Sequence, residues 1–331
     1  MEEDCTAESI AKESVPDLTQ GADMTANDPQ VPWTDEQWAR ANQVVQEEAS
    51  RARVAATFLP LVGPLPGGTD FVRRERIQYP GLPPALRPPP SQIAIDDRNI
   101  WQLATLQVPV RLRGAQMADP EMTSALTVLR RAANIVARLE DAIVFRGLVR
   151  DPATGRFRPP LSASGGLQPV WRIGGGEREE GLWELGGRRW LHIRRLPPWR
   201  RGEFLVRAVS EAIGLLERGG HFGPFAVVLD QRLFLIAQTP DRHGYVLPQD
   251  RIIPFLGGGS LLRSSTLHNR HIFTGLVLAL GAAPFELVVA TDMSLQFLQV
   301  TVEPEFLFRV RERIALRIKE TRAIVQLYMW R

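Results

Sequence analysis

The sequence predicts an α+β chain, in which helices are inserted between β-strands. Residues 119–145 carry apolar side chains at the spacing of one helix face, and residues 203–218 repeat that pattern. Residues 225–229 form a short apolar run, whereas residues 306–318 alternate apolar and polar side chains as a half-buried strand does. Because both kinds of pattern follow one another along the chain, we expect a mixed architecture.

The composition favours a soluble protein of one large or two modest domains. The chain has 331 residues, of which 44% are hydrophobic, enough for a sizeable core. Its longest apolar stretch, 273–285, is too short and too interrupted by glycine and proline to cross a bilayer. The acidic start at residues 1–4 is unlike a secretory signal, so we expect a cytoplasmic protein with no membrane partner. Cys5 is the only cysteine, which excludes an internal disulfide and a cysteine-based zinc site.

Arginine accounts for almost all of the basic residues. Lys12 and Lys319 are the only lysines, so 38 of the 40 basic residues are arginine, although the net charge is only +3. A genome rich in G and C explains this bias without any function. The functional alternative is that guanidinium groups tie subunits together through bidentate pairs.

The N-terminal third divides into three pieces. Residues 1–32 hold eight carboxylates and a single lysine, which predicts a disordered acidic tail. A helix then begins at Thr34, whose pairing with Gln37 three residues later fits a capping box, and the glycine- and proline-rich residues 63–68 end it. Residues 69–100 combine strand-like pieces with a proline-rich tip, which predicts an arm that packs on something else.

The remaining chain supplies the rest of the expected sheets. Residues 106–112 read as a strand, and the long helix that follows ends at Gly147. Residues 150–202 are rich in glycine, proline, arginine and tryptophan, with short β pieces expected. The C-terminal part predicts five further strands, at 273–280, 285–290, 296–302, 306–318 and 323–328.

Common catalytic and ligand-binding motifs are missing from the sequence. Neither lysine follows a glycine, so the glycine runs 174–176 and 257–259 are expected to be turns rather than phosphate-binding loops. The sequence holds no Gly-x-Ser-x-Gly elbow for a serine nucleophile. His268 and His271 are three residues apart, but a metal site needs a third ligand, so we expect a structural or solvated pair. We therefore predict that the chain is not an enzyme and binds no metal.

Two adjacent acids interrupt the apolar stripe of the long helix. Glu140 and Asp141 point about 100° apart on a helix, so they cannot converge on one substrate atom. We expect a structural ion pair with a partner arginine instead.

A basic and aromatic stretch offers a nucleic-acid alternative. Residues 188–201 interleave arginines with Trp190 and Trp199, a mixture that suits phosphate backbones and stacked bases. No recognised nucleic-acid motif surrounds this stretch. We favour a surface insertion whose tryptophans pack locally, and nucleic acid is not an expected partner.

Three colinear stretches resemble the encapsulins, the nanocompartment shell proteins that share the major-capsid fold of tailed phages. The first is Trp33-Thr34-Asp35-Glu36-Gln37-Trp38, leading through a helix to Val62-Gly63-Pro64. The second is Leu139-Glu140-Asp141-Ala142-Ile143-Val144-Phe145-Arg146-Gly147, similar to the family's Glu-Asp, Ile-Phe, Gly signature. The third is Gly223-Pro224-Phe225-Ala226-Val227-Val228-Leu229, followed by His243-Gly244-Tyr245 and the glycine-rich turn at 257–259.

This resemblance implies a division of the chain into the parts of a capsid subunit. It covers about residues 33–331, and the acidic tail and the arginine- and tryptophan-rich insertion are extra to the usual subunit. The implied parts are an N-terminal helix at 33–62, an extended loop at 63–108, a peripheral domain at 109–147 and 273–331, and an axial domain at 148–272 with the insertion at about 150–202.

The resemblance also implies a function. The expected protein is a self-assembling icosahedral shell subunit whose main partner is itself. Family members enclose a cargo enzyme, either a ferritin-like iron-storage protein or a dye-decolourising peroxidase, through a short targeting peptide. The alternative within the same fold is a phage major capsid protein that packages DNA.

Site residues follow from the same resemblance. The expected cargo-peptide contacts are Val45, Ala49, Arg53 and Ala56, and the expected pore-lining residues are Asp241, His243 and Tyr245. Trp101 lies where some members stack a flavin, and a buried interface tryptophan is the alternative. No other cofactor is expected.

Overall fold

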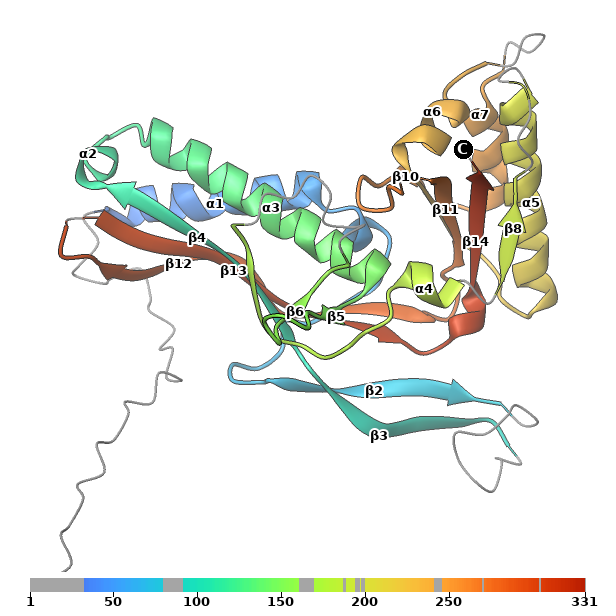
Figure 1. The fold of residues 1–331 in the computed structure, drawn as a ribbon, viewed down its shortest axis with the longest axis horizontal. Helices are drawn as coiled ribbons and strands as arrows, with labels where there is room; N and C mark the ends of the chain where they lie inside the picture. Colours follow the sequence, from blue (N-terminus) through green and yellow to red (C-terminus); the bar gives the residue numbers. More distant parts are fainter. Residues whose placement is uncertain are drawn as a thin grey trace, which may run out of the picture.

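The computed structural model shows two lobes and a projecting hairpin (Figure 1). Each lobe is built around one five-stranded sheet with helices packed against it, so the predicted α+β class is confirmed. The expected tail at 1–32 and the proline-rich tip lie outside the described residues, which are 33–79, 92–160, 170–186, 189–193, 197, 200–240, 246–269, 271–303 and 305–330. No helix among these residues is long and apolar enough to cross a membrane.

The first lobe is a sheet covered by two helices. Three long strands pair antiparallel in its centre, and a short strand joins each edge. The strands, in spatial order, are β1 (Leu61–Val62), β12 (Phe285–Val300), β13 (Glu305–Ile318), β4 (Ala104–Arg113) and β7 (Arg172–Gly175). The helices are α1 (Asp35–Ala52) and α3 (Thr123–Arg146), which pack against each other and the sheet.

Strand β13 shows why the sheet buries one face. Phe308, Val310 and Ile314 alternate with half-exposed residues, and all three are buried beneath the helices. Burying these side chains contributes about 1.5–3 kcal/mol each relative to exposure. The predicted alternation at 306–318 is therefore confirmed, and it fixes which face of the strand meets the core.

The predicted boundaries shift where local hydrogen bonds decide them. Helix α3 begins at Thr123 rather than near 119, because Asp119 accepts backbone hydrogen bonds from Glu121 and Thr123 in a turn. The capping box of Thr34 and Gln37 forms as predicted. The two strands expected at 285–290 and 296–302 are one strand, β12, whose register shifts mark bulges.

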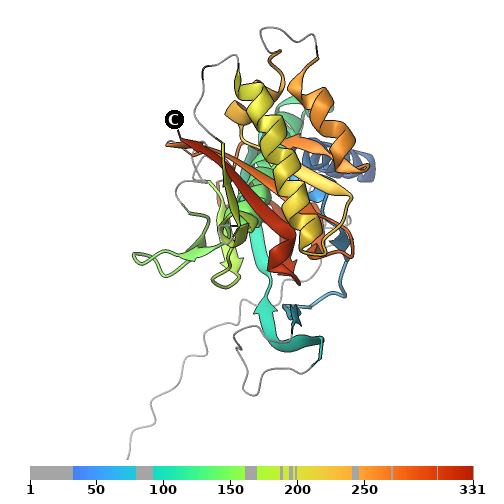
Figure 2. The same ribbon diagram turned by 90° about the vertical axis from the view of Figure 1, so that its right-hand side faces the viewer.

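The second lobe is a sheet flanked mainly by three helices. Its strands, in spatial order, are β10 (Leu261–Arg263), β9 (Phe225–Leu229), β11 (Ile272–Ala279), β14 (Ile324–Trp330) and β8 (Trp190–His192). Its helical elements are α5 (Arg201–Arg218), α6 (Gln231–Ala237), α7 (Pro248–Ile252) and the 3-10 turn η3 (Ile253–Leu256). Figure 2 shows α5 lying across this sheet.

This topology changes two predicted domain boundaries. Strands β11 and β14 were expected in the peripheral domain, at 273–331, but both pair in the second sheet beside β9. The 150–202 stretch was expected to be an insertion, but two of its strands belong to the main sheets. Strand β7 pairs in the first sheet, and β8 pairs in the second. Short elements complete the fold, namely α2 (Gly114–Met117), β5 (Val149–Arg150), β6 (Phe157–Arg158) and α4 (Leu182–Gly186).

Candidate functional site: the hairpin arm and the buried charge cluster

A two-stranded hairpin, which we call the arm, projects from the first lobe (Figure 1). It consists of β2 (Phe71–Gln78) and β3 (Ala94–Gln102), which pair antiparallel. Residues from Ala104 onward already pair with β13, so the arm ends at 103 rather than at the expected 108. Ile77 donates a backbone hydrogen bond of 2.9 Å to Lys319, which ties one strand of the arm to the body.

Charged contacts fix the root of the arm. Glu75 lies 3.6 Å from both Arg317 and Lys319, and both cations also reach Glu286. Because Glu286 and the two cations are largely buried, this network holds the arm at a defined angle to the sheet.

The outer part of the arm carries apolar side chains in contact with solvent. Ile93, Ile95 and Ile100 are 68%, 65% and 59% exposed, and Phe71 at the root is 52% exposed. A two-stranded hairpin is marginally stable alone, and a concentration of exposed isoleucines marks an interaction surface. The arm is thus suited to lie against another surface.

A cluster of charges, centred on Arg53, joins the end of α1 to three other elements of the first lobe. Arg53, directly after α1, lies 2.8 Å from Glu140 of α3 and 2.9 Å from Asp292 of β12, and it also contacts Glu312 of β13. Glu140 and Glu312 are fully buried. The predicted pairing of the helix acids with an arginine is therefore confirmed for Glu140.

Asp141 has a different role from its neighbour. Its carboxylate accepts hydrogen bonds from the backbone N–H groups of Val54 and Ala55, at 2.8–3.1 Å. It thereby satisfies donors in the turn that follows α1. Burial nevertheless raises the pKa of Asp141 to about 8, and the negative charge of Glu140 adds to this effect.

The two buried glutamates of the cluster share one cation. Burial raises the pKa of Glu312 well above its usual value, with Glu140 adding to the shift and Arg53 opposing it. The only cation in contact with both buried glutamates is Arg53, among the residues that the structure describes. Sequence analysis missed Glu312, although a charge at a core position of the β13 alternation was a visible signal.

Sequence comparison identifies the family. Residues 24–155 and 180–315 match the family described as "Encapsulating protein for peroxidase". The chain belongs to the encapsulin family. Its sequence is 26% identical to the type 1 encapsulin shell protein EncA of Myxococcus xanthus (strain DK1622), over 89% of this chain and 93% of that protein.

Solved structures place the encapsulin chain in the phage-capsid fold. It resembles the virus-like particle from Pyrococcus furiosus with a TM-score of 0.54 and 12% identity, over 88% of this chain and 99% of that one. It resembles the capsid of Myoviridae phage XM1 with a TM-score of 0.54 and 10% identity, over 82% and 89% of the two chains. The predicted capsid-like fold is confirmed, and the protein is an encapsulin shell protein.

The expected cargo-docking residues do not form one surface in this encapsulin. Val45 and Ala49 are fully buried, so a peptide bound on the outside of α1 does not reach them. Arg53 is occupied by the charge cluster, and Ala56 is half-buried in the turn after α1. Those residue choices require correction, because the small alanine-rich face of α1 packs against α3 and β12. Docking of a cargo peptide to the shell stays a prediction.

Trp101 lies at the root of the arm and is half-buried. The guanidinium of Arg74 lies 4.4 Å from the centre of its ring, and the ring packs against a small cluster that includes Val72 and Leu103. A flavin stacked on Trp101 would need to displace one of these contacts. The geometry therefore agrees better with a packing tryptophan, and flavin binding remains a prediction.

The remaining candidates are the expected pore residues and two histidines. Asp241, His243 and Tyr245 lie outside the described residues. His268 and His271 are exposed in a non-helical segment, which does not place them on one helix face. No group of three histidine, cysteine or acidic side chains in the described segments could hold a metal ion.

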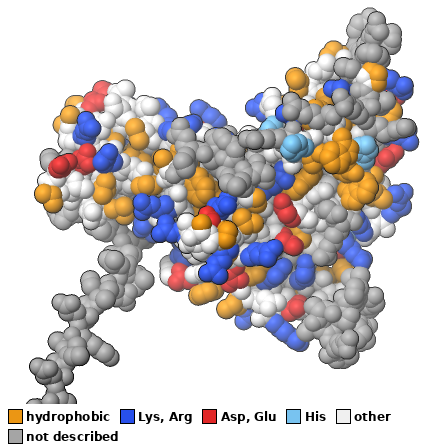
Figure 3. Space-filling model, in the orientation of Figure 1, with side chains coloured by type: hydrophobic (Ala, Val, Ile, Leu, Met, Phe, Trp, Pro, Cys, Tyr) orange, Lys and Arg blue, Asp and Glu red, His pale blue; other side chains and the backbone are white. Residues whose placement is uncertain are grey.

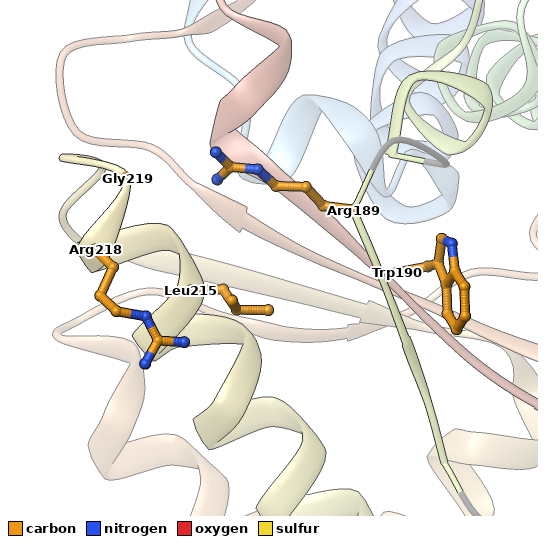
Figure 4. A pocket seen from close by; sticks show the side chains of 5 residues that line it. All are labelled: Arg189, Trp190, Leu215, Arg218 and Gly219. Carbon is orange, nitrogen blue, oxygen red and sulfur yellow. The ribbon is translucent and has the colours of Figure 1, made fainter.

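The basic and aromatic stretch borders a shallow depression of about 480 Å³ on the second lobe. Figure 4 shows Arg189 and Trp190 pointing to opposite sides of their strand, with Leu215 and Arg218 on α5. Arg189 donates a hydrogen bond to the carbonyl of Arg322. Hydrophobic side chains gather over this lobe beside histidines (Figure 3). The exposed Trp190 and Trp330 both pack against the ring of Tyr328. These side chains do not converge on one ligand.

Proposed function

We propose that this encapsulin self-assembles into a closed icosahedral shell in the cytoplasm and encloses a cargo enzyme. The shell has no catalysis of its own in this proposal. The observation that supports assembly most directly is the arm, with exposed Ile93, Ile95 and Ile100 held away from the body by the Glu75 network.

The geometry of the arm supports a role in recognition between subunits. In a closed symmetric assembly, every subunit presents the same complementary surfaces. The arm supplies an apolar surface on one subunit that would be covered by a neighbour. Each isoleucine buried there would contribute part of the about 1.5–3 kcal/mol of full burial, because about a third of each residue is already covered in the isolated subunit.

The proposed cargo is an enzyme that carries a short targeting peptide. The description of the matched family names peroxidase, which favours a dye-decolourising peroxidase over a ferritin-like iron-storage protein. The docking surface for that peptide is expected on the inner wall of the shell, at residues other than the buried Val45 and Ala49.

Electron microscopy of the purified chain tests this function. Uniform hollow particles that elute in the megadalton range, with the ultraviolet absorbance of protein alone, are the expected result. Filled particles that retain DNA would favour the phage capsid alternative. A monomer at all concentrations would contradict self-assembly. Co-expression with a peroxidase bearing its native C-terminal peptide, compared with the same enzyme lacking that peptide, tests cargo loading.

A further inference from the structure

One face of the first sheet carries an unusual number of arginines. Strand pairing places Arg311 beside Gln107, which in turn lies beside Arg172. It also places Arg309 beside Pro109 and Leu307 beside Arg111, and all of these residues lie on the side opposite the buried core residues. We call this surface the arginine face. It consists of Arg111, Arg113, Arg172, Arg309, Arg311 and Arg313.

Carboxylates contact only part of this arginine face. Glu305 lies 3.2 Å from Arg111 and 3.9 Å from Arg113, and Asp70 contacts Arg313. Arg172 and Arg309 pair with no carboxylate among the described ion pairs on this surface. Arg309 donates to the amide oxygens of Gln296 and Gln107, which carry no compensating charge.

The chain itself contains a segment of opposite charge. Residues 1–32 hold eight carboxylates and one lysine. This segment joins the described structure at Trp33, whose ring stacks on Phe308 with centroids 5.0 Å apart. Phe308 precedes Arg309 in β13, so the acidic segment is anchored to the strand that contributes most to the arginine face.

The acidic segment is long enough to reach from the core side of the sheet to the arginine face. Trp33 lies on the core side, so the chain must pass the end of the strands to reach the arginine face. A flexible chain of 32 residues has a root-mean-square span of about 30 Å. Neighbouring strands lie about 4.8 Å apart, so this span covers several strands. Tethering also gives the carboxylates a high effective concentration near the arginines.

We propose that the acidic segment 1–32 binds the arginine face of its own subunit. The interaction is electrostatic and is shared among several carboxylate–arginine pairs. The sequence does not single out one acidic residue as the partner of one arginine. It screens the positive charge of the sheet and keeps other polyanions, such as nucleic acid, away from this surface.

Photo-cross-linking from Cys5 tests the proposal on the full chain. Cys5 is the only cysteine and stands between Glu3-Asp4 and Glu8, so benzophenone maleimide labels the acidic segment alone. Peptide mapping should find cross-links on β4 and β13 of the same chain. Cross-linking should fall as sodium chloride rises from about 0.05 M to about 0.5 M, because the screening length shortens.

Charge variants provide the matched comparison. Arg111→Gln/Arg113→Gln/Arg309→Gln should reduce these cross-links about fivefold or more, since several weak pairs are lost together. The control Arg207→Gln/Arg218→Gln/Arg251→Gln alters exposed arginines of the second lobe and should change nothing. A full-length variant with the eight acids of the segment changed to amides leaves the folded lobes intact and should lose the same cross-links.

Three results would overturn the proposal. Cross-links that map elsewhere, or that survive both high salt and the amide variant, would exclude an electrostatic contact with the arginine face. Cross-links to β4 and β13 of a second copy, seen as covalent dimers, would exclude binding within one subunit.

Discussion

Arg53 Nε lies 2.8 Å from Glu140 Oε2, and this contact joins the end of α1 to α3 in the interior of the first lobe. Glu312 approaches the same guanidinium from the sheet. Because both glutamates are fully buried, their ionised forms depend on Arg53 for compensation. The cluster thus links the end of α1 to α3 and to the sheet through one side chain.

Replacing Arg53 should destabilise the protein strongly. Arg53→Ala leaves two buried glutamates without their cation, and we expect a loss of about 3–5 kcal/mol in the free energy of unfolding. Chemical denaturation followed by tryptophan fluorescence measures this loss, since Trp33 and Trp38 report on α1. The control is Arg51→Ala, two residues earlier, whose side chain is 80% exposed and pairs only with Glu48 in the described structure. Equal effects of the two variants would contradict the role of the cluster.

The same cluster predicts that stability falls as the pH rises. Burial raises the pKa of Asp141 to about 8 and that of Glu312 well above its usual value. The native state then binds more protons than the unfolded state above pH 4.5, so stability is highest at mildly acidic pH and declines through about pH 8. Melting temperatures measured from pH 5 to pH 9 should show this decline.

Glu312→Gln isolates the contribution of one carboxyl group. The amide stays neutral at every pH, so the variant should lose less stability than the parent protein between pH 5 and pH 9. Asp292 and Glu140 still face Arg53 in this variant and keep its charge compensated. Glu303→Gln, at an exposed turn, should leave the pH profile unchanged. Parallel profiles for the parent protein and Glu312→Gln would refute this assignment.

The end of α3 requires glycine for two reasons. Gly147 has a φ of 74°, and a Cβ there would lie 2.0 Å from the carbonyl oxygen of Glu179. Gly147→Ala should therefore lower the free energy of unfolding by more than about 2 kcal/mol, because backbone strain and a clash with the backbone act together. Gly114→Ala is the control, since open space surrounds that position. A thermal shift no larger than that of the control would show that the 179–181 segment moves aside.

The sequence predicted the elements that depend on local pattern. Thr34 and Gln37 specify the start of α1 by their own hydrogen bonds, and the alternation around Phe308 and Val310 specifies the buried face of β13. Pairing between distant strands left no comparable local signal. Strand β14 was therefore predicted as a strand, but its pairing with β11 and β8 was not, because the tertiary fold decides that pairing.

The candidate site was predictable to a similar degree. The isolated acids Glu140 and Asp141 within an apolar helix stripe indicated a buried charge pair, and Glu140 forms one. The partner Arg53 lies 87 positions earlier, at the end of another helix, and only the packing of α1 on α3 brings the two together. Residues chosen by resemblance alone fared less well, since Val45 and Ala49 prove to be buried.

Charge on the arm should block assembly without unfolding the subunit. Ile95→Arg/Ile100→Arg adds two cations to side chains that are 65% and 59% exposed, so the isolated subunit loses little stability. A neighbouring subunit that covers these positions would have to bury unpaired charges, at a cost of several kcal/mol per contact. Size-exclusion chromatography should therefore show a folded, small species, with unchanged circular dichroism. The matched control is Val302→Arg, at a fully exposed turn, which should still assemble. Normal shells from the arm variant would show that the arm does not lie at a buried subunit contact.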